Sequence, residues 1–191
     1  MTVSGHLIRS ILSAALLCVC GCACTLFSPE EPSGTSYFDL EQPERIPLPV
    51  PVEVASFSSA SNERFRMSFR ENAVLFRSSD RNRWAQTPGM LLTKYLRLAF
   101  RNGEKDVPAD PGRKVHLKGE VLAFNTSGDQ AELAVRYTLQ YKDRVVGKTV
   151  LFREKMKQFT PEGFAHAMSR AAFRLAQLVR KESTLLAGGK I

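Results

Sequence analysis

Four cysteines lie within seven residues near the N-terminus, and they are the side chains of this sequence best suited to chemistry. They stand at every second position, Cys18, Cys20, Cys22 and Cys24, and the chain has no others. Thiolates at close spacing could bind a soft metal ion such as Zn²⁺. No histidine or carboxylate lies close by in the sequence to complete such a site. The residues that precede the cysteines favour a different chemistry, the covalent modification of one thiol.

Those preceding residues have the layout of a bacterial export signal. A short segment with one arginine, Arg9, leads into an apolar run from Ile11 to Val19, and a small residue, Gly21, comes directly before Cys22. This order resembles the lipobox of bacterial lipoproteins, in which the signal is cleaved and the cysteine is acylated. The run of about ten apolar residues is far below the ~20 of a membrane-spanning helix, which disfavours a transmembrane anchor. We therefore predict a signal peptide over residues 1–21.

The choice of the acylated cysteine depends on the residues before each candidate. Cys22 follows a small residue and has the apolar Val19 three places back, which fits best. Cys24 follows Ala23 but has Gly21 three places back, where a lipobox wants an apolar residue. The two earlier cysteines follow bulky side chains. We predict Cys22 as the lipidation site, with Cys24 as the alternative.

Outside the cysteine cluster, little in the sequence points to catalysis. His6 precedes the cysteines, while His116 falls in an expected strand and His166 in an expected helix. Neither of the last two has Cys, Asp or Glu at metal-ligand spacing, so each is expected to be a surface or hydrogen-bonded residue. The G-x-S-x-G, H-E-x-x-H and glycine-rich phosphate-loop motifs are missing. We predict a protein that is not an enzyme, with no metal site and no cofactor.

The only tryptophan, Trp84, follows Arg83 at the junction between an expected strand and an expected helix. One interpretation makes Trp84 a core residue between the helix and the sheet. The other makes Arg83 and Trp84 a partner-binding site, because both residue types are favoured at the energetic centres of protein interfaces. Tyr137 and Tyr141 share a strand face with leucines, and are interpreted as core and rim rather than as a ligand platform.

Length and charge limit the class of protein. Removal of the signal leaves about 170 of the 191 residues, a length typical of one domain. The net charge is +8, from 27 basic and 19 acidic residues. On an exported protein, a basic surface favours anionic lipid headgroups or acidic partners over nucleic acid; ordinary solvated strand faces are the alternative. The basic residues are scattered: Arg64, Arg66, Arg70, Arg77, Arg81, Arg83, Arg113, Lys114, Arg153, Lys155 and Lys157.

The N-terminal part of the mature chain has the composition of a flexible tether. Residues 23–36 are rich in Ser, Pro, Glu and Gly, and at ~3.1 Å per extended residue they could hold a domain roughly 40 Å from a lipid surface. We predict a lipidated N-terminus and flexible tether over 22–36, a single domain over 37–186, and a tail over 187–191.

The domain divides into two stretches of strands, each followed by a helix. Short strands are expected near 37–40 and 50–57, a hairpin over 64–78 that turns at Glu71–Asn72, and a helix that opens at Thr87–Pro88 and ends at Gly103. A loop follows over 103–112. Three strands come next, with turns at 125–129 and 142–144, and Gly119 suggests a bulge or a close approach.

The last helix opens at Thr160–Pro161 and carries one continuous apolar stripe. Two helices of this kind can share one face of a sheet. We predict an α/β (α+β) two-layer sandwich, with a mixed, largely antiparallel sheet and two main helices packed on one face. The stripe consists of Phe164, Met168, Ala171, Ala172, Leu175, Leu178 and Val179.

The order of these features resembles a known family. A lipobox is followed by YFDL, the strand VPVEVASF, the run FRMSFRENAVLFRSSDRNRW over 65–84, a helix with L-L-x-x-Y-L, a strand meander and an Ala-rich final helix. The series resembles the ABC-type transport auxiliary lipoproteins, the group that includes the paraquat-inducible protein C lipoprotein. The resemblance spans nearly the whole mature chain, although the loop 103–112 and the Cys-rich lipobox have no counterpart in it.

The resemblance implies a function in transport across the cell envelope. It implies a non-enzymatic lipoprotein that faces the periplasm from the outer membrane, with Ala23 after the acylated cysteine consistent with that destination. The implied partners are an ABC transporter permease and ATPase complex and a substrate-binding protein of the mammalian-cell-entry type, which carry lipids or other apolar molecules. The alternatives are an assembly lipoprotein that docks on an outer-membrane barrel, and a module that itself binds an apolar ligand.

Overall fold

The structure is a computed structural model that describes residues 34–60, 65–101 and 114–188. The helices and strands that it describes lie in one compact unit, Thr35–Ile191. The strands are β1 (Ser36–Phe38), β2 (Val52–Val54), β3 (Ser58–Ser59), β4 (Arg66–Arg70), β5 (Phe76–Trp84), β6 (Val115–Ser127), β7 (Gln130–Tyr141) and β8 (Arg144–Lys155); the helices are α2 (Pro88–Ala99) and α3 (Pro161–Leu186).

Several predicted features lie outside the described residues. These are the signal peptide over 1–21, the candidate lipidation sites Cys22 and Cys24, and the loop 103–112. The predicted boundaries of the tether (22–36), the domain (37–186) and the tail (187–191) stay predictions.

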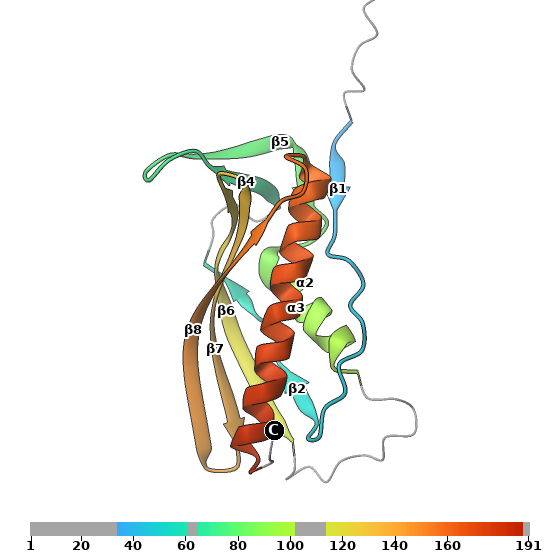
Figure 1. Ribbon diagram of the computed structural model, residues 1–191, viewed down its shortest axis with the longest axis vertical. Helices are drawn as coiled ribbons and strands as arrows, with labels where there is room; N and C mark the ends of the chain where they lie inside the picture. The colour runs from blue at the N-terminus through green and yellow to red at the C-terminus, as the bar shows by residue number, and fades with distance from the viewer. Residues whose placement is uncertain (1–33, 61–64, 102–113, 189–191) are drawn as a thin grey trace, which may run out of the picture. The chain divides into compact units, whose positions relative to one another are not determined.

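The strands form one mixed sheet, and the predicted fold class is confirmed. The sheet runs in the order β1-β5-β4-β6-β7-β8, and β2 and β3 also pair with β6. The β4–β5, β6–β7 and β7–β8 pairs are antiparallel, whereas β1 pairs with β5, and β2, β3 and β4 pair with β6, in parallel. Figure 1 shows the two helices against this sheet, with α3 running along β6, β7 and β8.

The long meander β6–β7–β8 follows from residue alternation. In β7 the buried side chains take every second position, which turns one face of the strand to the helices and the other to solvent. The turns are shorter than predicted. Gly128 and Asp129 connect β6 to β7, with Gly128 at a φ of +58°, and Asn125 to Ser127 belong to β6. The polar types of Asn125 and Thr126 suggested a turn, but both are buried between β4 and β7 in the ladder.

Two other boundaries also differ from the prediction. The expected strand over 50–57 is shorter than predicted, because only Val52–Val54 forms a strand, β2. Strand β3 follows beyond the predicted range at Ser58–Ser59, and β2 and β3 pair with different parts of β6. Helix α2 begins as predicted, where the Thr87 side chain accepts from the Met90 amide, but it ends at Ala99 rather than at Gly103. Phe100 leaves the helical conformation at a φ of −100° and a ψ of 6°, and the Ala99 carbonyl instead accepts from the Ile46 amide at 2.8 Å. Tertiary contacts therefore end this helix.

Helix α3 holds the two layers together. Its predicted stripe is buried apart from the half-buried Leu178, and its many alanines allow close packing on β7 and β8. Its N-terminal part lies beside the hairpin, where the rings of Phe164 and Phe69 are 6.0 Å apart. Its C-terminal end lies beside the start of β8, where Arg144 donates to the Leu186 carbonyl at 3.3 Å. A helix of 26 residues is about 39 Å long, so these two ends present separate surfaces.

Candidate functional site

A break in the strand ladder along β6 lies beside a hollow near the hairpin. On one side of β6, strand β3 pairs with Glu120 and Val121, and β4 pairs with 125–127. Among the described strands, none pairs with residues 122–124 on that side, and the register of β6 with β7 shifts between Val121 and Ala123. A pocket of about 430 Å³ opens at this point, and we call it the hairpin cleft.

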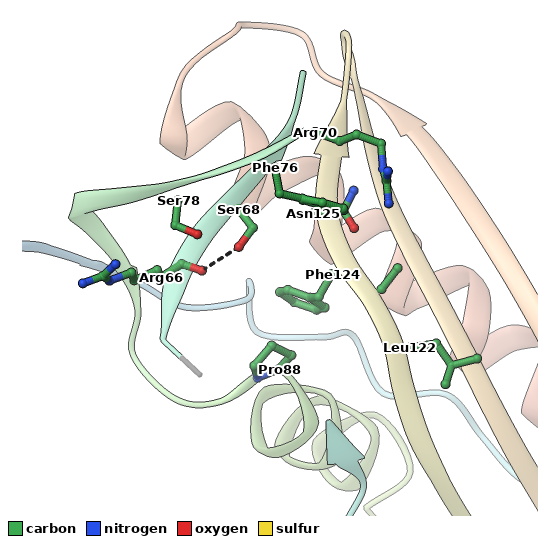
Figure 2. A pocket seen from close by; sticks show the side chains of 10 residues that line it. Arg66, Ser68, Arg70, Phe76, Ser78, Pro88, Leu122, Phe124 and Asn125 are labelled. Atoms are coloured by element: carbon green, nitrogen blue, oxygen red, sulfur yellow. Dashed lines mark hydrogen bonds between the residues drawn. The ribbon is translucent and has the colours of Figure 1, made fainter. Parts of the chain in front are cut away.

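Three parts of the fold line the hairpin cleft. The hairpin β4–β5 forms one wall, a short length of β6 forms the floor, and the first residue of α2, Pro88, closes one end. Figure 2 shows Phe124 above Pro88 and below Ser68 and Ser78 of the hairpin, with Arg66 and Arg70 on opposite sides. The lining residues are Arg66, Ser68, Arg70, Phe76, Ser78, Pro88, Leu122, Ala123, Phe124 and Asn125.

Two arginines from β4 supply positive charge to the cleft. The Arg70 guanidinium lies 3.9 Å from the ring centroid of Phe76, a cation–π contact, and donates to the Ala73 carbonyl at 3.0 Å. Arg66 pairs with Asp80 at 3.3 Å, but both side chains are well exposed, so this pair contributes about 0–1 kcal/mol to stability. Because the pairing is weak, the Arg66 guanidinium can exchange Asp80 for another anion at little cost.

The tip of the hairpin is exposed and apolar. Val74, Leu75 and Phe76 are all exposed, Val74 to 91 %. The turn that presents them is fixed by the Asn72 Oδ1 atom, which accepts from the amides of Val74 and Leu75 at 3.0 and 2.9 Å. The Glu71–Asn72 turn was predicted from the sequence, whereas the exposure of the apolar residues after it was not. We call Val74, Leu75 and Phe76 the hairpin tip.

Trp84 lies in the core, and its proposed contact with a partner is wrong for this structure. Its side chain has no exposed surface. The indole packs edge-on against Phe124 and Phe164, with ring centroids 4.9 and 5.1 Å away. The alternative interpretation, a core residue between the helix and the sheet, describes its position. Trp84 does not line the hairpin cleft, and it is linked to the cleft through its contact with the ring of Phe124.

Arg83, the residue before Trp84 in β5, has a side chain whose hydrogen-bonding groups are not all paired. It is half-buried, and it faces Tyr37 of β1 and Arg66 of β4 in the sheet register. Its buried Nε atom has no hydrogen-bond partner among the described residues, and the same holds for Trp84 Nε1 and Gln86 Oε1. Buried polar atoms are rarely left unpaired. The junction from β5 to α2 therefore holds buried polar atoms without a partner among the described residues, and a partner role for Arg83 stays a prediction.

The two histidines in the described part of the chain each lie beside one carboxylate. His116 Nδ1 is 3.0 Å from Glu53, and His166 Nδ1 is 2.7 Å from Glu41. A hydrogen bond from Lys114 lowers the pKa of Glu53. Residues 34–60, 65–101 and 114–188 contain no group of three His, Cys, Asp or Glu side chains able to hold a metal ion. Within the same ranges, neither helix is long and apolar enough to cross a bilayer.

Solved structures share this fold at low sequence identity. A crystal structure described as an uncharacterized protein superposes with a TM-score of 0.64 at 11 % identity, covering 78 % of this chain and 98 % of the other. Protein XCC0632 from Xanthomonas campestris, of the DUF330 family, gives a TM-score of 0.57 at 18 % identity, covering 82 % of this chain and 94 % of the other. These likenesses show the fold alone. A search of curated protein sequences finds no match.

A comparison with family models supplies the link to function. The model of the ABC-type transport auxiliary lipoprotein component matches residues 63–179, which is more than half of the chain. The matched range includes the hairpin, both helices apart from the last turns of α3, and the whole meander. The resemblance noted in the sequence is thereby confirmed, and this chain belongs to the ABC-type transport auxiliary lipoprotein family.

Proposed function

We propose that this chain is a non-enzymatic lipoprotein of the outer membrane that faces the periplasm and assists an ABC-type transport system for lipids or other apolar molecules. Its partners would be the permease and ATPase complex and a substrate-binding protein of the mammalian-cell-entry type. The family match over 63–179 carries this proposal.

The anchor is the acylated thiol of Cys22. Gly21 before it and Val19 three places back support its modification over that of Cys24. Stable attachment to a bilayer needs more than one acyl chain, and lipoprotein maturation supplies several at a single cysteine. Ala23 at the next position supports delivery to the outer membrane.

The docking surface is the hairpin tip together with the rim of the hairpin cleft. Exposed aromatic and aliphatic side chains beside arginines have the composition of interface centres. The tip supplies the apolar part, and Arg66 and Arg70 supply the charge. A partner that covers this area would remove the apolar tip from water.

The anchor is tested by comparing Cys22→Ala with Cys24→Ala in the full-length protein. We expect Cys22→Ala to lose metabolic labelling with palmitate and to leave the outer-membrane fraction. The matched variant Cys24→Ala should keep both. The opposite pattern would move the lipid to Cys24, and loss in neither variant would remove the anchor from the proposal.

The docking surface is tested by isolating the full-length protein from native envelopes in mild detergent and identifying co-purified proteins by mass spectrometry. The test variant is Leu75→Asp with Phe76→Asp. The matched control is Val145→Asp with Leu151→Asp, which places the same charges on exposed apolar residues of β8. We expect the wild type and the control to retain a permease or a mammalian-cell-entry-type protein, and the tip variant to lose it.

Other outcomes of the same experiment separate the competing functions. Enrichment of an outer-membrane barrel in place of transporter components would favour an assembly lipoprotein. Equal loss of the transporter partner in both double variants would place the contact elsewhere on the domain. Retention of the partner by the tip variant would overturn the docking surface and leave the family-level function in place.

A further inference from the structure

A second hollow lies at the other end of α3 from the hairpin cleft. It has a volume of about 570 Å³ and lies between the start of β8 and the last turns of α3. This volume falls within the range of about 300–1,000 Å³ that is typical of small-molecule sites. We call it the helix-end groove. It is lined by Arg144, Val146, Lys148, Leu178, Lys181, Glu182, Leu185 and Leu186.

The wall of the helix-end groove is largely aliphatic. Val146 comes from β8, while Leu178, Leu185 and Leu186 come from α3. Leu186 is buried against the sheet, but Leu185 remains 49 % exposed. Covering such aliphatic surface with an apolar ligand removes it from water, which is favourable in proportion to the area.

The charge around this wall is positive. Arg144, Lys148 and Lys181 lie on the rim, and Glu182 is the only carboxylate among the described lining residues. Glu182 is 8 % exposed and fully engaged, since its Oε2 accepts from the Tyr137 hydroxyl at 2.6 Å and its Oε1 pairs with Lys148. Arg144 donates to a neutral acceptor, the Leu186 carbonyl. The charges of Arg144 and Lys181 thus remain for an anion at the mouth of the groove.

The groove is large enough for one acyl chain. A volume of 570 Å³ holds roughly twenty groups the size of a water molecule, at about 30 Å³ each. The planar guanidinium of Arg144 matches a carboxylate in two-pronged geometry, and Lys181 adds a point charge beside it.

We infer that the helix-end groove binds a long-chain fatty acid, with its acyl chain along Val146, Leu178 and Leu185 and its carboxylate at Arg144 and Lys181. This binding site is separate from the hairpin tip and cleft, and it does not depend on which partner docks there. Beside the groove, Glu182 of α3 accepts from Tyr137 of β7 and pairs with Lys148 of β8, which fixes α3 to the sheet.

The test is photo-crosslinking of the full-length lipoprotein in native membranes with a diazirine analogue of palmitate, followed by peptide mapping. We expect the label on peptides that cover 144–148 or 178–186. A label confined to other peptides, or no label, would overturn the inference. A diazirine analogue of lysophosphatidylglycerol is run in parallel, and stronger labelling of the same peptides by it would reassign the site to a phospholipid.

Two charge reversals at adjacent helix positions supply the control. Both residues border the segment near Pro47–Pro49, but of the two only Lys181 also lines the helix-end groove. We expect Lys181→Glu to lower the yield of the palmitate crosslink about tenfold, since each charge near a lipid headgroup alters binding severalfold. Arg180→Glu should leave the yield within about twofold. Equal losses would mean that general surface charge, rather than the groove, recruits the probe.

A third variant distinguishes a loss of ligand binding from a loss of folding. Leu185→Asp places a charge in the apolar wall at an exposed position, so the fold should tolerate it. We expect it to lower crosslinking as much as Lys181→Glu does, with an unchanged thermal unfolding midpoint. Full crosslinking by Leu185→Asp would exclude the acyl chain from this wall and would overturn the inference.

Discussion

The indole of Trp84 stands edge-on to the ring of Phe124, with the ring centroids 4.9 Å apart and the planes at 75°. This contact joins the end of β5 to the C-terminal part of β6 beside the hairpin cleft. The face of Phe124 that lines the cleft is therefore held in place by a residue that no partner can touch. Variants of Trp84 report on the fold, and variants of the hairpin tip report on docking.

Replacement of Trp84 by alanine should lower the free energy of unfolding by about 3–5 kcal/mol, because it empties a fully buried site next to Phe124 and Phe164. Urea unfolding followed by circular dichroism measures this loss. Trp84→Phe should cost clearly less, since it keeps an aromatic ring in the site. A loss below 1 kcal/mol for the alanine variant would contradict the buried position.

The side chains of Tyr137 and Glu182 should be energetically coupled through the hydrogen bond between them. Its partners come from β7 and α3, and both are buried. Tyr137→Phe and Glu182→Gln should each lower the free energy of unfolding by about 1–3 kcal/mol, because each leaves or weakens a buried polar group. The double variant should cost less than the sum of the two single variants, as measured by urea unfolding. Strict additivity would show that the two side chains do not interact in solution.

Gly119 should not tolerate a side chain. A Cβ atom there would lie 2.4 Å from the Phe57 ring and 2.7 Å from the Arg136 carbonyl oxygen. Gly119→Ala should therefore lower the free energy of unfolding by about 1–3 kcal/mol through overpacking. Gly147→Ala is the matched control, because a Cβ atom there would meet its nearest neighbours only at 3.9 Å. Comparable losses of stability in the two variants would contradict the close approach at Gly119.

Alkaline pH should destabilise the fold through Tyr95. Burial, with smaller contributions from Glu41 and Glu44, raises the pKa of Tyr95 to about 12. The phenol of an unfolded chain has a pKa of about 10. The stabilisation is fully present below pH 10 and is lost as the pH rises towards 12, since the unfolded state releases the proton first.

The matching measurement compares the wild type with Tyr95→Phe by urea unfolding at pH 8 to 12. The wild type should lose stability across the upper part of this range, and the variant should show a shallower decline there. Tyr137, whose pKa is also raised by burial and by its bond to Glu182, contributes in the same direction in both proteins. Parallel pH curves for the two proteins would rule out the contribution of Tyr95.

Local patterns in the sequence were enough to predict the helices, the meander and the fold class. The alternation in β7 and the apolar stripe of α3 each specify which face of an element is buried, and this depends only on neighbours in the chain. The Thr-Pro pairs located both helix starts for the same reason. The close approach at Gly119 was also suggested locally, since a residue without a Cβ atom permits it.

The sites depend on contacts between distant parts of the chain, which no local pattern contains. Trp84 could be placed in the core only once Phe124 and Phe164 were known to lie beside it. Asn125 and Thr126 were assigned to a turn because their types suit turns, yet strands on both sides hold them in the sheet. The hairpin cleft exists because β3 ends and β4 begins at different points along β6, and the helix-end groove exists because α3 ends beside β8. Residue types along the chain specify which faces of each element are apolar. Which of these faces meet depends on tertiary contacts, because strand pairing and register are set by residues far apart in the chain.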